Sequence, residues 1–238
     1  MARNDTLLDN VIWHSLLGPL GRLGEVHGRA GRFLPEVLPL WALDDPTDPD
    51  SWNALAKISE VGQALALGAR SVAPPPDWTR LNEARVAQMV DAGVEGMADP
   101  QVEVLGSRDL PAMVELLHLS PPGGPFEKRT HEMGSYLGLR DGGRLVAMAG
   151  ERFRVDGWTE ISSVTTHPGF RRRGLATRLV QTLVESIHAR GELAFLHTSN
   201  EHARRLYEQM GFTVRTSMIL GFYAHAGEST LAECAASH

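Results

Sequence analysis

The sequence has almost no cysteine and no long apolar run, which argues against a disulfide-bonded protein and a membrane protein. Cys234 is its only cysteine, so an intramolecular disulfide is excluded, and the small polar segment around it argues against a thiol nucleophile. No window approaches the roughly 18 to 20 apolar residues that span a bilayer. The first residues also lack the charged-then-apolar pattern of a signal peptide. We therefore expect a cytoplasmic protein with no membrane partner.

Lysine is scarce as well, with two residues against 21 arginines. The net charge of −6 belongs to the N-terminal part, because residues 1–100 hold 8 basic and 14 acidic residues while residues 101–238 hold 15 of each. This balance predicts no broad basic surface, and hence no nucleic-acid partner. The arginines that gather near one segment favour a local anion site instead: Arg152, Arg154, Arg171, Arg172, Arg173 and Arg178.

Residues 166–177 predict the end of a strand, a turn and the start of a helix. Trp158–Thr166 is rich in β-branched and aromatic residues and stops before Pro168. Apolar residues then recur at helical spacing, at Leu175, Leu179, Leu183 and Ile187. The first turn of a helix has N–H groups without intrahelical partners, and its dipole favours negative charge. The segment predicts a pyrophosphate site, with a solvated basic turn as the alternative.

A second motif follows at a short distance. Leu193–Thr198 is typical of a strand, and Asn200 can cap a helix that Gly211 ends. The apolar residues of this helix lie on one face: Ala203, Leu206, Tyr207 and Met210.

Other elements are predicted from periodicity and turn residues. In the first hundred residues we expect a helix capped by Thr6, strands within 31–41 and 63–72, a helix capped by Ser51, and an amphipathic stretch over 81–90. Further on we expect a strand over 101–105, a helix over 107–119, and strands over 136–140 and 145–155 joined by a hairpin turn at Asp141-Gly142-Gly143.

Together the two motifs resemble those of the GNAT superfamily of acyl-CoA-dependent N-acetyltransferases. The matching residues are Val164-x-Thr166-x-Pro168-x-x-Arg171-x-x-Gly174-x-Ala176 and Asn200-x-x-Ala203-x-x-Leu206-Tyr207-x-x-x-Gly211-Phe212. The resemblance covers residues 101–225 well and 1–100 faintly, and the C-terminal part looks most like the branch that includes glycine N-acyltransferase. It implies an α/β (α+β) GNAT fold over residues 99–238, with a mixed, mostly antiparallel sheet and helices on both faces. A smaller, degenerate GNAT-like lobe over 1–98 would precede it, and a flexible tail would start near 226.

The resemblance also implies how acetyl-CoA, the expected co-substrate, is held without a metal. The diphosphate would lie on Arg171, Arg172, Arg173, Gly174, Leu175, Ala176 and Thr177. The pantetheine arm would lie along the backbone of Val164, Thr165 and Thr166, where an N–H group could also stabilise an oxyanion. Asn200 could reach the same arm, although its role as a helix cap would account for it alone.

Acyl transfer to an amine needs a base and an acid. Glu160 resembles the glutamate base of the family, and strict alternation would put it on one strand face with Trp158, Ser162, Val164 and Thr166. The alternative for Glu160 is a strand-end carboxylate that lies in water or pairs with Arg152 or Arg154, and Glu151 is a rival base. Tyr207 matches the tyrosine that protonates the departing thiolate, with a core aromatic as the alternative. His167 and His197 lack metal-ligand spacing, but His197 could flank the acceptor amine.

The expected function is transfer of an acetyl group from acetyl-CoA to a primary amine of a small molecule or peptide, by direct attack. A non-catalytic acyl-CoA sensor is the alternative. Residues 120–125 form a glycine- and proline-rich loop that could act as a lid over the acceptor pocket. The sequence indicates neither the acceptor nor the oligomeric state.

Overall fold

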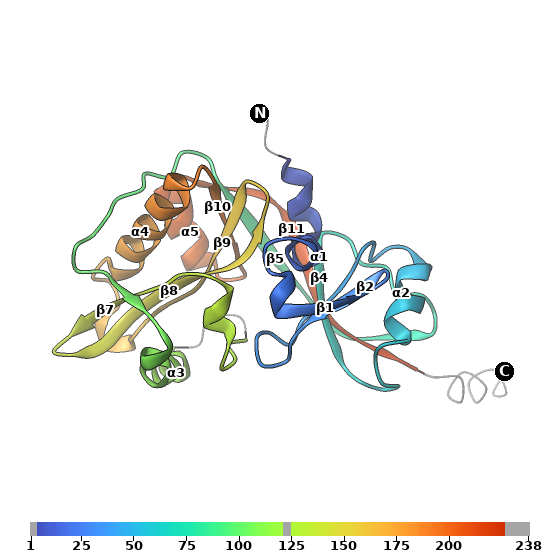
Figure 1. Cartoon of the computed structure of the whole chain (residues 1–238). Helices are drawn as coiled ribbons and strands as arrows, with labels where there is room; N and C mark the ends of the chain where they lie inside the picture. The colour runs from blue at the N-terminus through green and yellow to red at the C-terminus, as the bar shows by residue number, and fades with distance from the viewer. Residues whose placement is uncertain (1–3, 121–124, 227–238) are drawn as a thin grey trace. The chain divides into compact units, whose positions relative to one another are not determined.

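The computed structural model describes residues 4–120 and 125–226, which contain eleven strands and five α-helices (Figure 1). They form two compact units. One contains residues 87–216 with Asn4 and residues 36–38, and the other contains residues 5–35, 39–86 and 217–226. Strands β5 (Trp78–Asp91) and β11 (Phe212–His225) each contribute residues to both units. The predicted division into a lobe over residues 1–98 and a domain over 99–238 stays a prediction. The expected tail after Ala226 and most of the expected lid lie outside the described residues.

The first unit is built on a mixed, mostly antiparallel sheet, as the sequence predicts. Its strand order is β6 (Glu103–Leu105), β7 (Tyr136–Asp141), β8 (Arg144–Val155), β9 (Trp158–Thr166), β10 (Leu193–Thr198) and the end of β5. Neighbouring strands are antiparallel except β9 and β10. Gly142 and Gly143 both have positive φ, of 54° and 83°, which is the backbone that a two-residue hairpin turn requires. The predicted β7–β8 hairpin is therefore confirmed.

Helices cover both faces of this sheet (Figure 1). Helices α4 (Leu175–Ala189) and α5 (Glu201–Met210) pack on one face, and α3 (Leu110–Leu119) packs on the other. The inner face of α4 is fully buried and consists of Leu179, Val180, Leu183, Val184 and Ile187. Asn200 caps α5, and Gly211 ends it in a left-handed conformation at φ 105°, as predicted.

The second unit has its own sheet and core. The strand order is β1 (Gly24–His27), β2 (Ala30–Phe33), β3 (Trp41–Leu43), β4 (Leu65–Ala69) and residues 219–223 of β11. The same unit contains helices α1 (Val11–Leu17) and α2 (Pro49–Ala56). The aromatic centre of its core is Trp52, whose ring centroid lies 5.0 Å from that of Trp78 and 5.3 Å from that of Tyr223.

Several elements of this unit differ from their predictions for local reasons. The strand expected over 31–41 is divided into β2 and β3, because Pro35 and Pro39 have no N–H to donate to a neighbouring strand. Helix α2 begins earlier than expected, since Asp48 rather than Ser51 caps it, accepting from the Asp50 N–H at 3.0 Å. The chain after Asn4 begins with a 3₁₀ turn over Asp5–Asn10 before α1. The stretch over 81–90 belongs to the long strand β5.

A single buried carboxylate joins the end of β5 to α4. Asp91 accepts hydrogen bonds from the N–H groups of Gly93 and Val94, at 2.9 and 2.8 Å. Its second oxygen lies 2.6 Å from Nε2 of His188, in the last turn of α4. Asp91 therefore fixes the turn after β5 against the helix that carries the predicted pyrophosphate site.

We expect Asp91→Ala to lower the free energy of unfolding by about 2 to 4 kcal/mol, because the N–H groups of Gly93 and Val94 and the ring of His188 lose their acceptor together. Urea unfolding of the purified protein measures the change. Glu115→Ala is the matched control, since that carboxylate is 66% exposed and its ion pair with Arg144 should contribute well under 1 kcal/mol. An equal loss in both variants would contradict the assignment.

Candidate functional site

The predicted strand, turn and helix start are all present at residues 158–189. Strand β9 ends at Thr166, a 3₁₀ turn spans Pro168–Phe170, and α4 starts after Gly174, whose φ of 74° is left-handed. The Arg178 N–H donates to the Gly174 carbonyl at 3.1 Å. The N–H groups in the first turn of α4 have no intrahelical acceptor and point out of the helix end, beside the exposed residues 171–174. This geometry suits an anion.

Of the six arginines expected to form an anion site near this helix end, three have no carboxylate partner among the described residues and could face an anion. The other three pair with carboxylates: Arg152 with Glu160, Arg154 with Glu192 and Arg178 with Asp99. The expectation of one six-arginine cluster is therefore wrong, because nearby acids neutralise these three side chains. The remaining cations are consecutive on the loop: Arg171, Arg172 and Arg173. Arg173 lies over the Phe170 ring, 4.8 Å from its centroid.

Ser120 holds Arg171 in place, and this contact was not predicted from the sequence. Arg171 Nη2 donates to the Ser120 hydroxyl at 2.6 Å, and Arg171 Nε lies 3.4 Å from the Thr166 carbonyl. The Ser120 carbonyl in turn accepts from the Thr165 hydroxyl. Ser120 is buried at the C-terminal end of α3. One serine thus connects α3, the end of β9 and the first arginine of the loop.

Strands β9 and β10 separate beside this loop. Their parallel pairing covers Trp158 to Glu160 on β9 and Leu193 to Phe195 on β10, and within the described residues it goes no further. Past this point β9 stays paired with β8 as far as Thr166, and β10 stays paired with β5 as far as Thr198. The β10-facing edge of residues 161–166 therefore has no strand partner in the described part of the chain. The predicted pantetheine contacts Val164, Thr165 and Thr166 lie in this stretch.

A bulge in β9 overturns the strict alternation of its side chains. Ser163 has a φ of 54°, and the register with β8 shifts between Met148 and Gly150. Ile161 and Val164, three positions apart, both pack in the core under α4. The expectation that Glu160 and Val164 share a face is therefore wrong, because the bulge adds one residue to the pleat.

Glu160 is fully buried and is the last residue of β9 that pairs with β10. One oxygen accepts from Arg152 Nε at 2.8 Å and from the Phe153 N–H at 3.3 Å. The other accepts from Arg152 Nη2 at 2.9 Å and lies 2.7 Å from His197 Nδ1. Burial alone would raise the pKa of Glu160, but the Arg152 charge and the hydrogen bonds from Arg152 and His197 lower it to about 2. The ion-pair alternative for Glu160 is thus present, whereas its role as a base stays a prediction.

The polar contacts continue beyond Glu160 across neighbouring strands. Nε2 of His197 lies 3.1 Å from Nε2 of Gln88, whose Oε1 accepts from Arg215 Nη1 at 2.9 Å. Because arginine only donates, the Gln88 oxygen must face Arg215 and its NH₂ must face His197. His197 Nε2 is therefore an acceptor, and Nδ1 carries the hydrogen toward Glu160. Sequence reasoning missed Gln88 and Arg215, which only the strand register brings close.

The remaining predicted residues have clear local roles. Tyr207 is buried on α5, edge-to-face with Phe212 at 5.9 Å between centroids, and burial raises its pKa to about 12. Its hydroxyl is therefore protonated at neutral pH, and its role as the acid stays a prediction. The Asn200 side chain accepts from the N–H groups of His202 and Ala203, at 2.9 and 3.1 Å. Asn200 is therefore a helix cap, as the alternative for this residue predicted, and its contact with pantetheine stays a prediction.

The rival base, a metal site and a membrane-spanning helix can be checked in the described residues. Glu151, the rival base, pairs with Arg190 at 2.8 Å. Within residues 4–120 and 125–226, no three histidine, cysteine or acidic side chains are grouped to hold a metal ion. The same residues contain no helix with the length and apolar character to cross a membrane.

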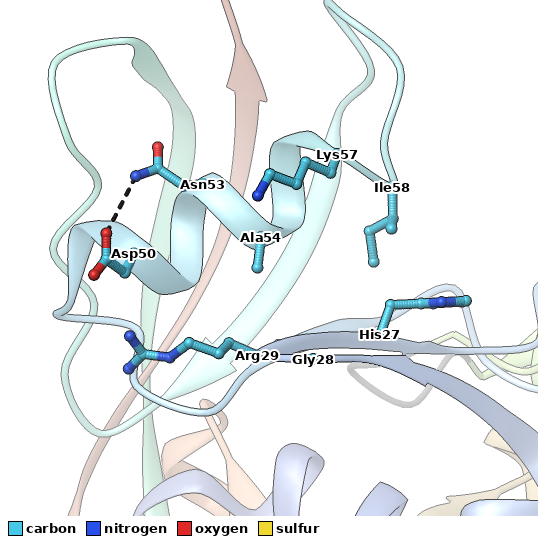
Figure 2. A pocket seen from close by; sticks show the side chains of 8 residues that line it. All are labelled: His27, Gly28, Arg29, Asp50, Asn53, Ala54, Lys57 and Ile58. Atoms are coloured by element: carbon cyan, nitrogen blue, oxygen red, sulfur yellow. Dashed lines mark hydrogen bonds between the residues drawn. The ribbon is translucent and has the colours of Figure 1, made fainter.

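A pocket of about 520 Å³ lies in the second unit, between α2 and the turn after β1 (Figure 2). It contains none of the predicted site residues, and Arg29 at its rim is paired with Asp44 and Asp48. Its lining residues are His27, Gly28, Arg29, Asp50, Asn53, Ala54, Lys57 and Ile58.

Comparison with known proteins identifies the family. Residues 136–219 match the family described as FR47-like protein. The crystal structure of a GNAT-family protein from Novosphingobium aromaticivorans has 35% sequence identity to this chain and a TM-score of 0.82, and the match covers 92% of this chain and 99% of that protein. This chain belongs to the GNAT family. No curated protein matches its sequence.

Two less similar structures share the GNAT fold. A GCN5-related N-acetyltransferase from Kribbella flavida has 19% identity and a TM-score of 0.58, covering 89% of this GNAT chain and 93% of its own. A GCN5-related N-acetyltransferase-like protein from Streptococcus suis has 13% identity and a TM-score of 0.54, covering 90% and 92%. At these identities the similarity supports the fold alone.

We expect Glu160→Gln to lower the free energy of unfolding at pH 7 by about 3 kcal/mol, because it leaves Arg152 buried without a counter-charge. The lowered pKa of Glu160 means that its stabilisation is present above the ordinary value of 4.5 and is lost as pH falls toward 2. The difference between the two proteins should therefore shrink from pH 5 to pH 2. Urea unfolding at pH 7, 5 and 3 measures it, with Glu115→Gln as control. A gap independent of pH would contradict the pairing.

Proposed function

We propose that this protein is an acyl-CoA-dependent N-acetyltransferase that moves an acetyl group from acetyl-CoA to a primary amine of a small molecule or peptide. The separation of β9 and β10 beside an arginine- and glycine-rich helix start is the observation that carries the proposal. An unpaired strand edge can receive an extended amide chain, and the adjoining helix end can receive a diphosphate. Family membership supports the same donor.

In this proposal each part of acetyl-CoA has its own contacts. The diphosphate lies on the N–H groups and side chains of residues 171–177, and the pantetheine arm runs along the backbone of residues 164–166. The thioester then lies near Glu160 and Phe195, where the strands part. A backbone N–H on β9 stabilises the oxyanion, and Tyr207, neutral at physiological pH, donates a proton to the departing thiolate.

One observation favours a second candidate, a non-catalytic acyl-CoA sensor. All the hydrogen-bonding positions of Glu160 are filled by Arg152, the Phe153 N–H and His197, so this carboxylate offers no free oxygen to an amine. A protein that only binds the donor would need no accessible base. The two candidates agree on acetyl-CoA and differ on turnover.

We expect acetyl-CoA to raise the melting temperature, because it would bind at the proposed donor site, and we expect a panel of amines and peptides to release free CoA thiol. Differential scanning fluorimetry measures binding, and a thiol-reactive dye measures release. Acetyl-CoA without acceptor controls for hydrolysis. Stabilisation without thiol release from any acceptor would favour the sensor, whereas the absence of stabilisation would contradict both candidates.

We expect Ser120→Ala to raise the Kd for acetyl-CoA roughly five-fold, equivalent to about 1 kcal/mol, because Arg171 loses the hydrogen bond that positions it. Binding of acetyl-pantetheine, which has no diphosphate, should not change. Calorimetric titration with both ligands measures the difference. Ser107→Ala is the control, since its exposed hydroxyl contacts His131 at 3.3 Å. Equal weakening of both ligands would contradict a role for Ser120 through the diphosphate.

A further inference from the structure

We propose that His197, held by Glu160, accepts the proton that the acceptor amine loses before it attacks. This inference rests on the proposed acetyltransferase function and names a residue for it. It starts from the position of Glu160, which has no exposed surface and no open hydrogen-bonding position. An ammonium group cannot donate to this carboxylate without displacing one of these donors.

His197 is the one partner of Glu160 that has a nitrogen lone pair. The orientation of Gln88 makes Nε2 the acceptor and leaves the hydrogen on Nδ1. The ring is fixed from two sides, by Glu160 at 2.7 Å and by an edge-on contact with Phe195 at 5.7 Å between centroids. Its side chain is 14% exposed, whereas that of Glu160 is 0% exposed. The histidine is therefore both oriented and partly accessible.

The position of His197 matches the proposed thioester site. Phe195 is the last β10 residue that pairs with β9, and His197 lies two residues further on, past the point of separation and on the same face of the strand. An N–H donor already meets its lone pair, because Gln88 directs its NH₂ there. The ammonium of an acceptor is the same kind of donor and would replace this contact.

The surrounding charges suit an imidazolium that forms during the reaction. Glu160 faces the ring with a full negative charge, balanced by Arg152 on its far side. Tyr136 contributes no charge at neutral pH, because burial raises its pKa to about 12. On the other side Gln88 is neutral and separates the ring from Arg215. Glu160 thus acts as a positioning residue that stabilises the protonated ring.

The proton balance closes without any further reagent. The ammonium passes one proton to His197 Nε2, and its nitrogen lone pair forms the C–N bond at the thioester carbon. The oxyanion collapses, the C–S bond breaks, and the thiolate takes a proton from Tyr207. The new amide nitrogen loses its surplus proton to the Tyr207 oxygen through solvent, and the imidazolium releases its proton to water. Amide, free thiol and one proton are the products.

The test uses His197→Asn, which can still donate to Glu160 but has no basic nitrogen in the place of Nε2. With an acceptor that the wild type uses, we expect kcat to fall 100-fold or more, while the Kd for acetyl-CoA stays within two-fold. His197→Gly should regain activity when imidazole is added. His118→Asn, a change of an exposed histidine on α3, is the control and should show neither effect.

The outcomes separate the two proposals. If the wild type releases thiol and His197→Asn keeps its kcat within three-fold, the role of His197 is overturned and the acetyltransferase function stands. If His197→Asn is poorly folded, the imidazole experiment decides, and no recovery of His197→Gly in imidazole counts against the proposal. If the wild type binds acetyl-CoA and acetylates no amine, the function fails, and the role of His197 fails with it.

Discussion

The structure around the candidate site depends on the neutralisation of one buried charge. Removing a carboxylate from water costs several kcal/mol, so Glu160 can stay ionised only where donors fill its hydrogen-bonding positions. Strand β8 supplies Arg152 and the Phe153 N–H, and β10 supplies His197. Only a guanidinium can contact both oxygens at once with two parallel N–H groups. One ionised side chain therefore holds three strands together.

This constraint explains how β9 and β10 can part in a stable way. An unpaired strand edge is a liability in most sheets. Here the two strands are held together at Glu160 and Phe195, and the bulge at Ser163 turns the chain after that point. The separation therefore follows from contacts within the protein, the pairing up to Glu160 and the bulge at Ser163.

Strands, helix caps and helix ends that depend on neighbouring residue types could be predicted from the sequence. Strands β9 and β10, the cap at Asn200 and the end of α5 at Gly211 are where residue types place them. The contacts of His197 could not be predicted, since Gln88 lies 109 positions away and becomes a neighbour only through the β5–β10 register. The bulge in β9 was equally hidden, because nothing in Ile161 to Val164 marks an extra residue.

Ser120 shows how such non-local contacts connect the two parts of the proposed donor site. Its carbonyl holds Thr165, in the stretch proposed for pantetheine, and its hydroxyl holds Arg171, in the loop proposed for the diphosphate. Because Ser120 also ends α3, the position of that helix end sets the positions of both contacts. In the proposed donor site, a movement of α3 would therefore shift the Thr165 and Arg171 contacts together, so the two halves of the site are coupled through the end of this helix.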